Sequence, residues 1–500
     1  MGKNVLIIYP YQLYDVSRLP KDVENIVVVE EPLIFGTDQQ HPLFVHKQKL
    51  IFLRASMRRY IEEVLWPAGY KVDYVECGQM NETGDIVNRL SHFENVIYFD
   101  LNDDLISRRL EEAISGLNPT PSVIILDSPN FFITREEARS FLANKSKSTF
   151  AHFYQWQRER FNILINSDTY EPVGGKLSFE KERKKRLPKN HQVPGSQVFG
   201  ANKFVEEARD YINKQFPNNP GSVTDFPWPT NHQESRVWLK EFLDHRLDHF
   251  SDYQEAIDGS LPWMYHSGIS PLLNVGLLDP AEVIDQALTR QEQSPIPIAN
   301  LENFIRQIVG WREYVRAIYI KQHVQLRASN TFGHNRKLTA DWYNGTTGIP
   351  PVDDVIRKVL ARSYSHHSER LMIIGNIMFL CDFDPNDVAR WFMEMHIDAY
   401  DWAVVPNVYA MSQFADGGSI ISKPFASDSN HILKMSHYEK GDWCDVWDGL
   451  YWRFVEKNKD RLSKNKNMST AVKQLGKLSD NKKRIFSYRA EDFLRDKTAP

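Results

Sequence analysis

The first 130 residues alternate short apolar runs with stretches of helical periodicity, and this alternation constrains the fold more than any other feature. Apolar runs of strand length lie at 4–10, 25–31, 71–77, 95–103 and 122–128, and helical periodicity lies at 46–66, 84–93 and 104–115. Alternating strands and helices predict a parallel sheet with helices on both faces. Ligands of such sheets bind at the carboxyl ends of the strands. No GxGxxG follows the first run, so the dinucleotide fingerprint is absent.

The second half of the chain is predicted to be mostly helical. Its 3.6-residue periodicity lies in the segments 235–257, 280–292, 300–322, 352–381, 384–400 and 442–457. The tail beyond 455 is rich in Lys and Asn, and we expect a solvated helix with a loose end there. The predicted fold class is therefore α/β plus all-α. Its expected domains are a Rossmann-like sheet domain at 1–132, a connector at 133–234 and a helical domain at 235–500.

Composition excludes several classes of protein. With 42% hydrophobic and 25% charged residues the chain resembles an ordinary soluble protein. No 18-residue apolar run is present, and the N-terminus lacks the layout of a signal peptide, so we expect a cytoplasmic location without a membrane span. Cys77, Cys381 and Cys444 lie far apart, which argues against a disulfide framework. The net charge of −4 means that any nucleic-acid binding must use a local patch.

The stretch 359–418 has the clearest candidate chemistry. His366 and His367 lie on an apolar-periodic segment, and few polar groups follow among many aromatic ones. A large planar cofactor needs apolar walls with a few fixed polar groups. On composition alone, a helical core with two satisfied histidines is the better interpretation. Upstream, Ser267 and Ser270 precede an apolar helix whose first backbone donors could bind an anion.

A basic run lies in the connector at 181–189. In isolation such a run is usually a solvated loop. The alternative interpretation is a contact with phosphate backbone.

Six motifs in order resemble the photolyase/cryptochrome superfamily, and more narrowly its prokaryotic branch of bacterial (6-4) photolyases and cryptochromes named for an iron–sulfur cluster. They are HKQKLIFLRASMR (46–58), VGGKLSFEKE (173–182), IRQIVGWREYVR (305–316), HHSERLMIIGN (366–376), RWF (390–392) and PNVYAMSQFADGG (406–418). The resemblance covers nearly the whole chain. It therefore reverses the preference for a plain helical core at 359–418.

The resemblance implies an FAD in the helical domain and an antenna chromophore on the sheet domain. The FAD residues that it implies are Ser267, Ser270, Arg306, Arg312, Glu313, Asn376, Asp398, Asp401, Asn407 and Met411. The antenna of this branch is 6,7-dimethyl-8-ribityllumazine, expected at the strand ends near Tyr9, Glu30, Glu31, Phe35, His46 and Lys47.

The implied chemistry is light-driven electron transfer from reduced flavin to a UV-damaged pyrimidine pair, the (6-4) photoproduct, which must first leave the base stack. His366 and His367 match the pair that includes a proton donor to the lesion, a task suited to imidazole near neutral pH. Trp391 matches the flavin-proximal ring of the chain that reduces FAD. Phe392 and Tyr343 match its further rings. Because Phe is harder to oxidise, we expect slow photoreduction or another route.

Two departures from the family stand out. The four places of the cluster cysteines hold Pro351, Glu439, Asp442 and Val455, and Cys444 lies out of register. Thiolates are the usual cluster ligands, so we predict a member without the [4Fe–4S] cluster. Val404 replaces a glutamate that many relatives place near the flavin.

The resemblance also assigns the connector loop to DNA. Lys181, Arg183 and Lys184 are expected beside the lesion, and Glu180 with Glu182 could recruit Mg²⁺. The expected partner is UV-damaged DNA, single- or double-stranded, bound by a monomer. A cryptochrome-type photoreceptor and a photolyase for cyclobutane dimers or single strands remain alternatives. The two histidines and the basic loop favour (6-4) repair.

Overall fold

The sheet domain forms as the sequence predicts. The structure is a computed structural model that describes residues 3–143, 149–180, 184–195, 197–199 and 202–500. Its sheet contains β1 (Asn4–Ile8), β2 (Asn25–Val29), β3 (Lys71–Val75), β4 (Asn95–Phe99) and β5 (Ser122–Leu126). All neighbouring strands are parallel, in the order β3-β2-β1-β4-β5. The central strands are buried because they carry continuous apolar runs.

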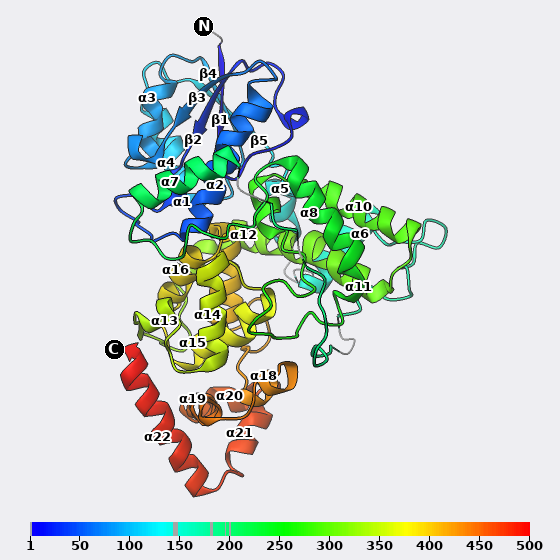
Figure 1. Cartoon of the computed structure of the whole chain (residues 1–500), viewed down its shortest axis with the longest axis vertical. Coiled ribbons are helices and arrows are strands. Elements are labelled where there is room, and N and C mark those ends of the chain that lie inside the picture. Colours follow the sequence, from blue (N-terminus) through cyan, green and yellow to red (C-terminus); the bar gives the residue numbers. More distant parts are fainter. Residues whose placement is uncertain (1–2, 144–148, 181–183, 196, 200–201) are drawn as a thin grey trace.

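Helices from the expected sheet domain and one helix from the connector cover this sheet. They are α1 (Pro32–Phe35), α2 (Lys47–Tyr60), α3 (Val87–Leu90), α4 (Asp104–Ser115) and, from the connector, α7 (Lys203–Gln215). Figure 1 shows α7 alongside α2. Arg54 of α2 is buried and pairs with Glu30 at 2.8 Å and with Glu207 of α7 at 2.6 Å. The connector is therefore fastened to the sheet domain by a charge network.

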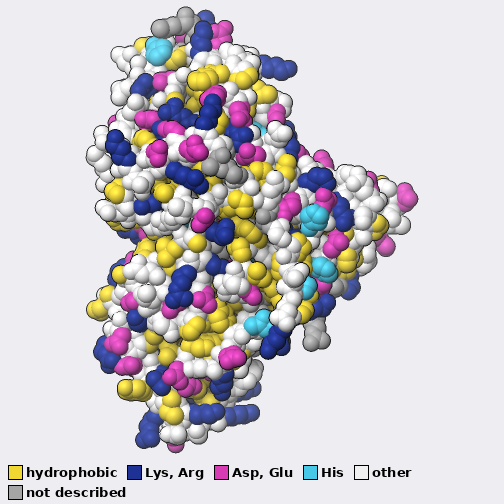
Figure 2. All heavy atoms as spheres, viewed as in Figure 1, with side chains coloured by type: hydrophobic (Ala, Val, Ile, Leu, Met, Phe, Trp, Pro, Cys, Tyr) yellow, Lys and Arg dark blue, Asp and Glu magenta, His cyan; other side chains and the backbone are white. Residues whose placement is uncertain are grey.

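The helical part forms the middle and the far end of the molecule (Figure 1). Its helices, with two more from the connector, are α5 (Arg135–Ala143), α6 (Phe150–Phe161), α8 (His232–His245), α9 (Ser270–Val275), α10 (Pro280–Gln293), α11 (Ile298–Ile305), α12 (Glu313–Arg327), α13 (Asp341–Asn344), α14 (Pro350–Arg362), α15 (Asn376–Leu380), α16 (Pro385–Met395), α17 (Asp401–Val405), α18 (Ser429–Met435), α19 (Asp442–Lys457), α20 (Lys459–Lys464), α21 (Ser469–Leu475) and α22 (Asp480–Lys497). Positive and negative side chains are interspersed over the described surface in view in Figure 2.

Two predicted helices are interrupted. The segment 235–257 is α-helical only as far as His245. The segment 352–381 breaks at Ser363, which has a φ of +54° and ends α14. The Ser363 carbonyl accepts from the Ile397 amide at 2.8 Å, so this turn is fixed by a distant segment. The break leaves His366 just before the next helical stretch and not on a continuous helix.

The C-terminal end is ordered, so the expected loose end was wrong. β7 (Thr498–Ala499) pairs with β6 (Lys337–Leu338) in an antiparallel ladder. The indole of Trp342 donates to the Lys497 carbonyl at 2.8 Å. In the described part of the chain, no helix has both the length and the apolar character needed to cross a bilayer.

Candidate functional site

A cavity of about 310 Å³ lies in the helical domain, and three π-helical segments contribute to its wall. They are Arg306–Arg312, Glu369–Gly375 and Pro406–Ser412. π-helical turns inside α-helices occur frequently at functional sites. Most of the wall is apolar or aromatic, through Phe250, Leu273, Phe304, Ile308, Trp311, Val315, Tyr364, Leu371, Phe392, Trp402, Val404, Val408 and Met411. This mixture suits a large planar ligand.

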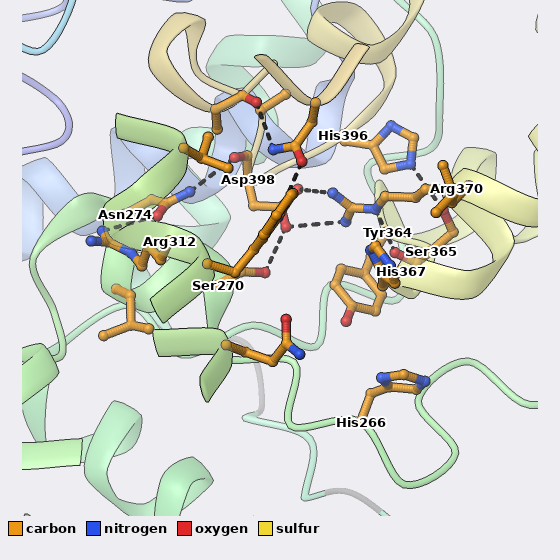
Figure 3. A pocket seen from close by; sticks show the side chains of 18 of the residues that line it. His266, Ser270, Asn274, Arg312, Tyr364, Ser365, His367, Arg370, His396 and Asp398 are labelled. Atoms are coloured by element: carbon orange, nitrogen blue, oxygen red, sulfur yellow. Dashed lines mark hydrogen bonds and ion pairs between the residues drawn. The ribbon is translucent and has the colours of Figure 1, made fainter. Parts of the chain in front are cut away.

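One charged cluster stands in the centre of the cavity wall. Arg370 donates to both carboxylate oxygens of Asp398, at 2.9 and 3.0 Å (Figure 3). Ser270 donates to the same carboxylate at 2.5 Å. Arg370 Nε also donates to the Ser365 carbonyl at 2.7 Å. The cluster therefore links three separate segments and holds a fixed charge pair against the cavity.

A second cation, Arg312, lines the cavity beside Asn274. Arg312 donates to the Asn274 side chain at 3.2 Å and to the Asn130 carbonyl at 2.5 Å, while its Nε has no hydrogen-bond partner. Its guanidinium lies over the rings of Phe131 and Trp402. Burial lowers the pKa of Arg312 to about 10, so it stays charged at neutral pH.

Three imidazoles, those of His266, His367 and His396, line the cavity. His366 is fully buried outside the lining, where its ring stacks on His266 with centroids 4.4 Å apart. Burial lowers the pKa of His367 to about 4 and places the pKa of His266 and His396 well below the ordinary value. These three rings are therefore neutral at pH 7.

A buried carboxylate lies behind the histidines. Glu369 Oε1 is 3.4 Å from His366 Nε2 and also accepts from Lys358. Although burial opposes ionisation, His366 and Lys358 lower the pKa of Glu369 to about 2. The pair of histidines predicted from the sequence is thus split into one ring at the cavity and one ring behind it.

The predicted FAD residues divide into two groups. Those in the cavity lining are Ser267, Ser270, Arg312, Asp398, Asn407 and Met411. Those outside the lining are Arg306, Glu313, Asn376 and Asp401, and each contacts other groups. Arg306 pairs with Glu180 at 2.6 Å, and Asp401 accepts from Tyr319. Glu313 accepts from two backbone amides near the start of α5, and Asn376 donates to Ser427.

Sequence reasoning missed several lining residues, among them His266, Asn274, Tyr364, Arg370 and His396. Arg370 lies inside the quoted motif HHSERLMIIGN, so it could have been selected as the cation nearest the histidines. His266 directly precedes Ser267, yet a single histidine in a loop carries no local signal of its partner a hundred residues away.

The three rings of the predicted aromatic chain lie at and near the cavity wall. Phe392 lines the cavity, and Trp391 packs behind it with ring centroids 5.1 Å apart. The Trp391 indole donates to the Trp342 carbonyl at 2.9 Å. Tyr343 lies outside the lining and donates to Glu394 at 2.8 Å. The redox roles of Trp391, Phe392 and Tyr343 stay predictions.

Buried polar atoms without partners gather at the carboxyl ends of β1 and β2. The hydroxyls of Tyr9 and Tyr11, and Oε2 of Glu31, have no hydrogen-bond partner in the described structure, nor does the hydroxyl of Tyr400. The rings of Tyr9, Tyr11 and Tyr400 form a row, with centroids 6.1 and 5.7 Å apart. Burial raises the pKa of Glu31 to about 8. Such orphaned groups would find partners in a polar ligand or an ordered water.

The other predicted antenna residues have structural partners. Glu30 is occupied by Arg54 and Tyr74, and Phe35 is fully buried in α1. His46 caps α2 by accepting from the Gln48 amide, and its other nitrogen contacts the Leu360 carbonyl at 3.1 Å. Lys47 donates to the Pro217 carbonyl at 2.9 Å.

The predicted metal places contain few donors. Pro351 and Val455 offer no ligand atom, and Cys444 is buried in α19. Within the described ranges, no group of three His, Cys, Asp or Glu residues is arranged to hold a metal ion. A [4Fe–4S] cluster therefore does not fit the residues at these places, which include Glu439 and Asp442 as the only donors.

The connector loop is only partly described. Lys181, Glu182 and Arg183 lie outside the described residues. Glu180 is paired with Arg306, and Lys184 donates to Ser251 at 2.6 Å. A divalent ion at Glu180 would therefore compete with the Arg306 guanidinium.

Comparisons with known proteins identify the family. Residues 6–228 match the family described as deoxyribodipyrimidine photo-lyase-related protein, and residues 301–424 match the FAD binding domain of DNA photolyase. The chain is 31% identical over 468 residues to the (6-4) photolyase of Agrobacterium fabrum, which covers 90% of this chain and 91% of that protein. The chain therefore belongs to the photolyase and cryptochrome family.

Solved structures show the same fold. A bacterial class III photolyase from Agrobacterium tumefaciens aligns with a TM-score of 0.59 and 16% identity, over 99% of this chain and 98% of that one. A cryptochrome from Synechocystis aligns with a TM-score of 0.58 and 14% identity, over 97% and 93% of the two chains. The α/β plus all-α fold class is confirmed.

The cavity residues fit FAD. The matched FAD-binding segment includes Arg312, Arg370, Asp398 and Asn407 of the lining. The Arg312 Nε without a partner suits an anionic group, and the aromatic walls suit flat rings.

Proposed function

We propose that the protein repairs (6-4) photoproducts in UV-damaged DNA in a light-driven reaction. The observation that carries the proposal is that His367 lines the same cavity as the Arg370–Asp398 pair, inside the segment that matches the FAD-binding domain. The 31% identity to a (6-4) photolyase supports this choice of lesion. The FAD, when bound, supplies a photoexcited electron donor.

The protein provides orientation and exclusion of water. The aromatic wall keeps water from the reacting groups, which strengthens electrostatic interactions inside the cavity. Arg370 and Asp398 hold each other in place and present a fixed dipole to the ligand. The Asn407 amide is held by the Trp311 indole at 3.2 Å and is a fixed polar group at the wall. Val404 adds only apolar surface at this wall.

His367 is the proposed proton donor at the lesion. Its pKa of about 4 makes the resting ring neutral, so it must gain a proton as negative charge reaches the bound bases. An added negative charge raises the pKa of a neighbouring imidazole. Behind the cavity, the Glu369 carboxylate lies 3.4 Å from His366 Nε2.

The remaining assignments belong to the same proposal. Trp391 carries electrons toward the cavity past Phe392, and the unpartnered groups around Tyr9 and Glu31 hold 6,7-dimethyl-8-ribityllumazine. The connector, with Lys184, lies beside the DNA, and Glu180 with Glu182 would hold a Mg²⁺ that supplies positive charge near the phosphates. The protein acts as a monomer without an iron–sulfur cluster.

The test is light-dependent repair of one defined (6-4) lesion in single- and double-stranded DNA. Turnover with bound FAD supports the proposal, and His367→Ala should abolish it while FAD stays bound. Repair of cyclobutane dimers alone would show that the proposed substrate, the (6-4) photoproduct, is wrong. Bound FAD without repair of either lesion would contradict the proposal and favour a photoreceptor.

A further inference from the structure

His266 places an unused nitrogen at the cavity. The side chain comes from the loop before α9, is only 7% exposed and lines the cavity. Its Nε2 has no hydrogen-bond partner in the described structure. Figure 3 shows the ring set apart from the Arg370–Asp398 pair, on the side of Tyr364 and His367. A buried polar atom without a partner calls for a ligand.

The chemical form of this ring follows from its surroundings. The Gln254 backbone lies near the ring and favours a proton on it. We assign this proton to Nδ1, which leaves the unpartnered Nε2 as the lone-pair atom. Burial and the nearby Arg246, His366 and His367 all disfavour a second proton. The neutral ring therefore presents Nε2 as a lone-pair acceptor.

The position of the acceptor is rigid. The His366 ring stacks on His266 with an interplanar angle of 10°. Arg246 donates to the His266 carbonyl at 2.8 Å and holds the backbone. The His366 backbone amide in turn donates to the Glu369 carboxylate at 3.3 Å. A rigid acceptor recognises one donor geometry at little entropic cost.

We propose that His266 Nε2 accepts a hydrogen bond from an N–H or O–H group of the flipped, damaged pyrimidine and so contributes to recognition of the lesion. A neutral acceptor repels phosphate oxygens but suits a ring N–H or a hydroxyl, and flipped bases are read by such bonds. This inference rests on the proposed function. It adds a recognition residue beside the expected proton donor.

Three substitutions distinguish the contribution of the Nε2 acceptor from that of the ring's packing. His266→Phe keeps the stack on His366 and removes the acceptor. His266→Gln can place an amide oxygen near the former Nε2, whereas the shorter side chain of His266→Asn reaches only as far as Nδ1. Thermal unfolding and FAD content of each variant establish that fold and cofactor are intact.

The measurement is binding in the dark to a short DNA with one (6-4) lesion and to the same DNA undamaged. We expect His266→Phe and His266→Asn to weaken lesion binding about tenfold, since a buried donor loses its acceptor. His266→Gln should bind within about threefold of wild type, and the affinity for undamaged DNA should not change.

Three outcomes would overturn the inference. In the first, His266→Phe binds the lesion as tightly as wild type. In the second, His266→Phe loses FAD, which would make the acceptor a cofactor contact, because an adenine amino group could supply the same N–H. In the third, wild type itself does not prefer lesion DNA, in which case the proposed function fails first and the role of His266 falls with it.

Discussion

Arg370 and Asp398 are joined by two hydrogen bonds, of 2.9 and 3.0 Å, although they lie 28 positions apart in the chain. Asp398 has a second donor in Ser270. The pair thus fastens the loop of the histidines to the segment before α17. We expect both cofactor retention and stability to depend on it.

Asp398→Asn should lower both the retention of FAD and the stability of the protein. The substitution leaves Arg370 without its counter-charge, and we expect a loss of about 2 kcal/mol in the free energy of unfolding. FAD content after gel filtration should also fall. Urea unfolding and absorbance measure the two effects. Arg108→Ala, which breaks an exposed ion pair with Asp104, is the control and should change stability by less than about 0.5 kcal/mol. Full FAD content in Asp398→Asn would contradict the assignment.

Stability should fall on acidification through buried neutral histidines such as His46. Burial lowers the pKa of folded His46 from 6.5 to about 4. The unfolded chain therefore binds a proton below pH 6.5 that the folded chain refuses until about pH 4, and stability decreases as pH falls through this window. The titration of His46 alone should lower the free energy of unfolding by about 2 kcal/mol between pH 7 and pH 5.

His46→Asn is the variant that tests this. Asn can still cap α2 through the Gln48 amide but does not titrate. Urea unfolding at pH 7 and pH 5 should show a smaller difference for the variant than for wild type. Equal differences in the two proteins would refute the role of His46.

Tyr9→Phe tests the antenna site. The Tyr9 hydroxyl is buried and unpartnered, so its removal should not destabilise protein stripped of chromophores and could add about 1 kcal/mol. Antenna content should fall, and FAD content should stay the same. Tyr60→Phe is the control, because the Tyr60 hydroxyl donates to the Tyr14 carbonyl and its loss should destabilise without releasing the antenna. Unchanged antenna content in Tyr9→Phe would remove Tyr9 from the site.

Iron and acid-labile sulfide should be absent from anaerobically purified protein. At the four places where the resemblance puts the cluster cysteines, the chain has Pro351, Glu439, Asp442 and Val455, which supply no thiolate. Chelator treatment should leave the unfolding transition unchanged. Stoichiometric iron and sulfide would overturn this prediction.

Close packing of α19 on α22 is expected to stabilise the region of Asp442 and Val455, which lie in α19. A Cβ at Gly449 of α19 would lie 2.5 Å from the Phe486 carbonyl of α22. Gly449→Ala should therefore cost about 1–3 kcal/mol, even though Ala favours helix. In Gly476→Ala the nearest atom would be 3.5 Å away, and stability should stay nearly constant. Equal unfolding curves for wild type and Gly449→Ala would contradict this packing.

Local pattern was sufficient for much of the fold. The five apolar runs became the five parallel strands, and the segments 104–115 and 442–457 became α4 and α19 with the same bounds. Short continuous apolar runs determine the strands, and an apolar periodicity of 3.6 residues determines the helices, because these local patterns fix which side chains are buried. The family was identifiable for the same reason, since its motifs are short and contiguous.

Tertiary contacts decided where a predicted helix breaks and which distant side chains meet, because apolar periodicity encodes neither. Ser363 adopts its left-handed turn against Ile397, which breaks a helix that the local pattern predicts as continuous. The stacking of His266 on His366 joins residues 100 positions apart. The sequence by itself determined the layers of the fold and the family. Only the folded chain decided which imidazole faces the cavity, because burial and pairing depend on neighbours that are distant in sequence.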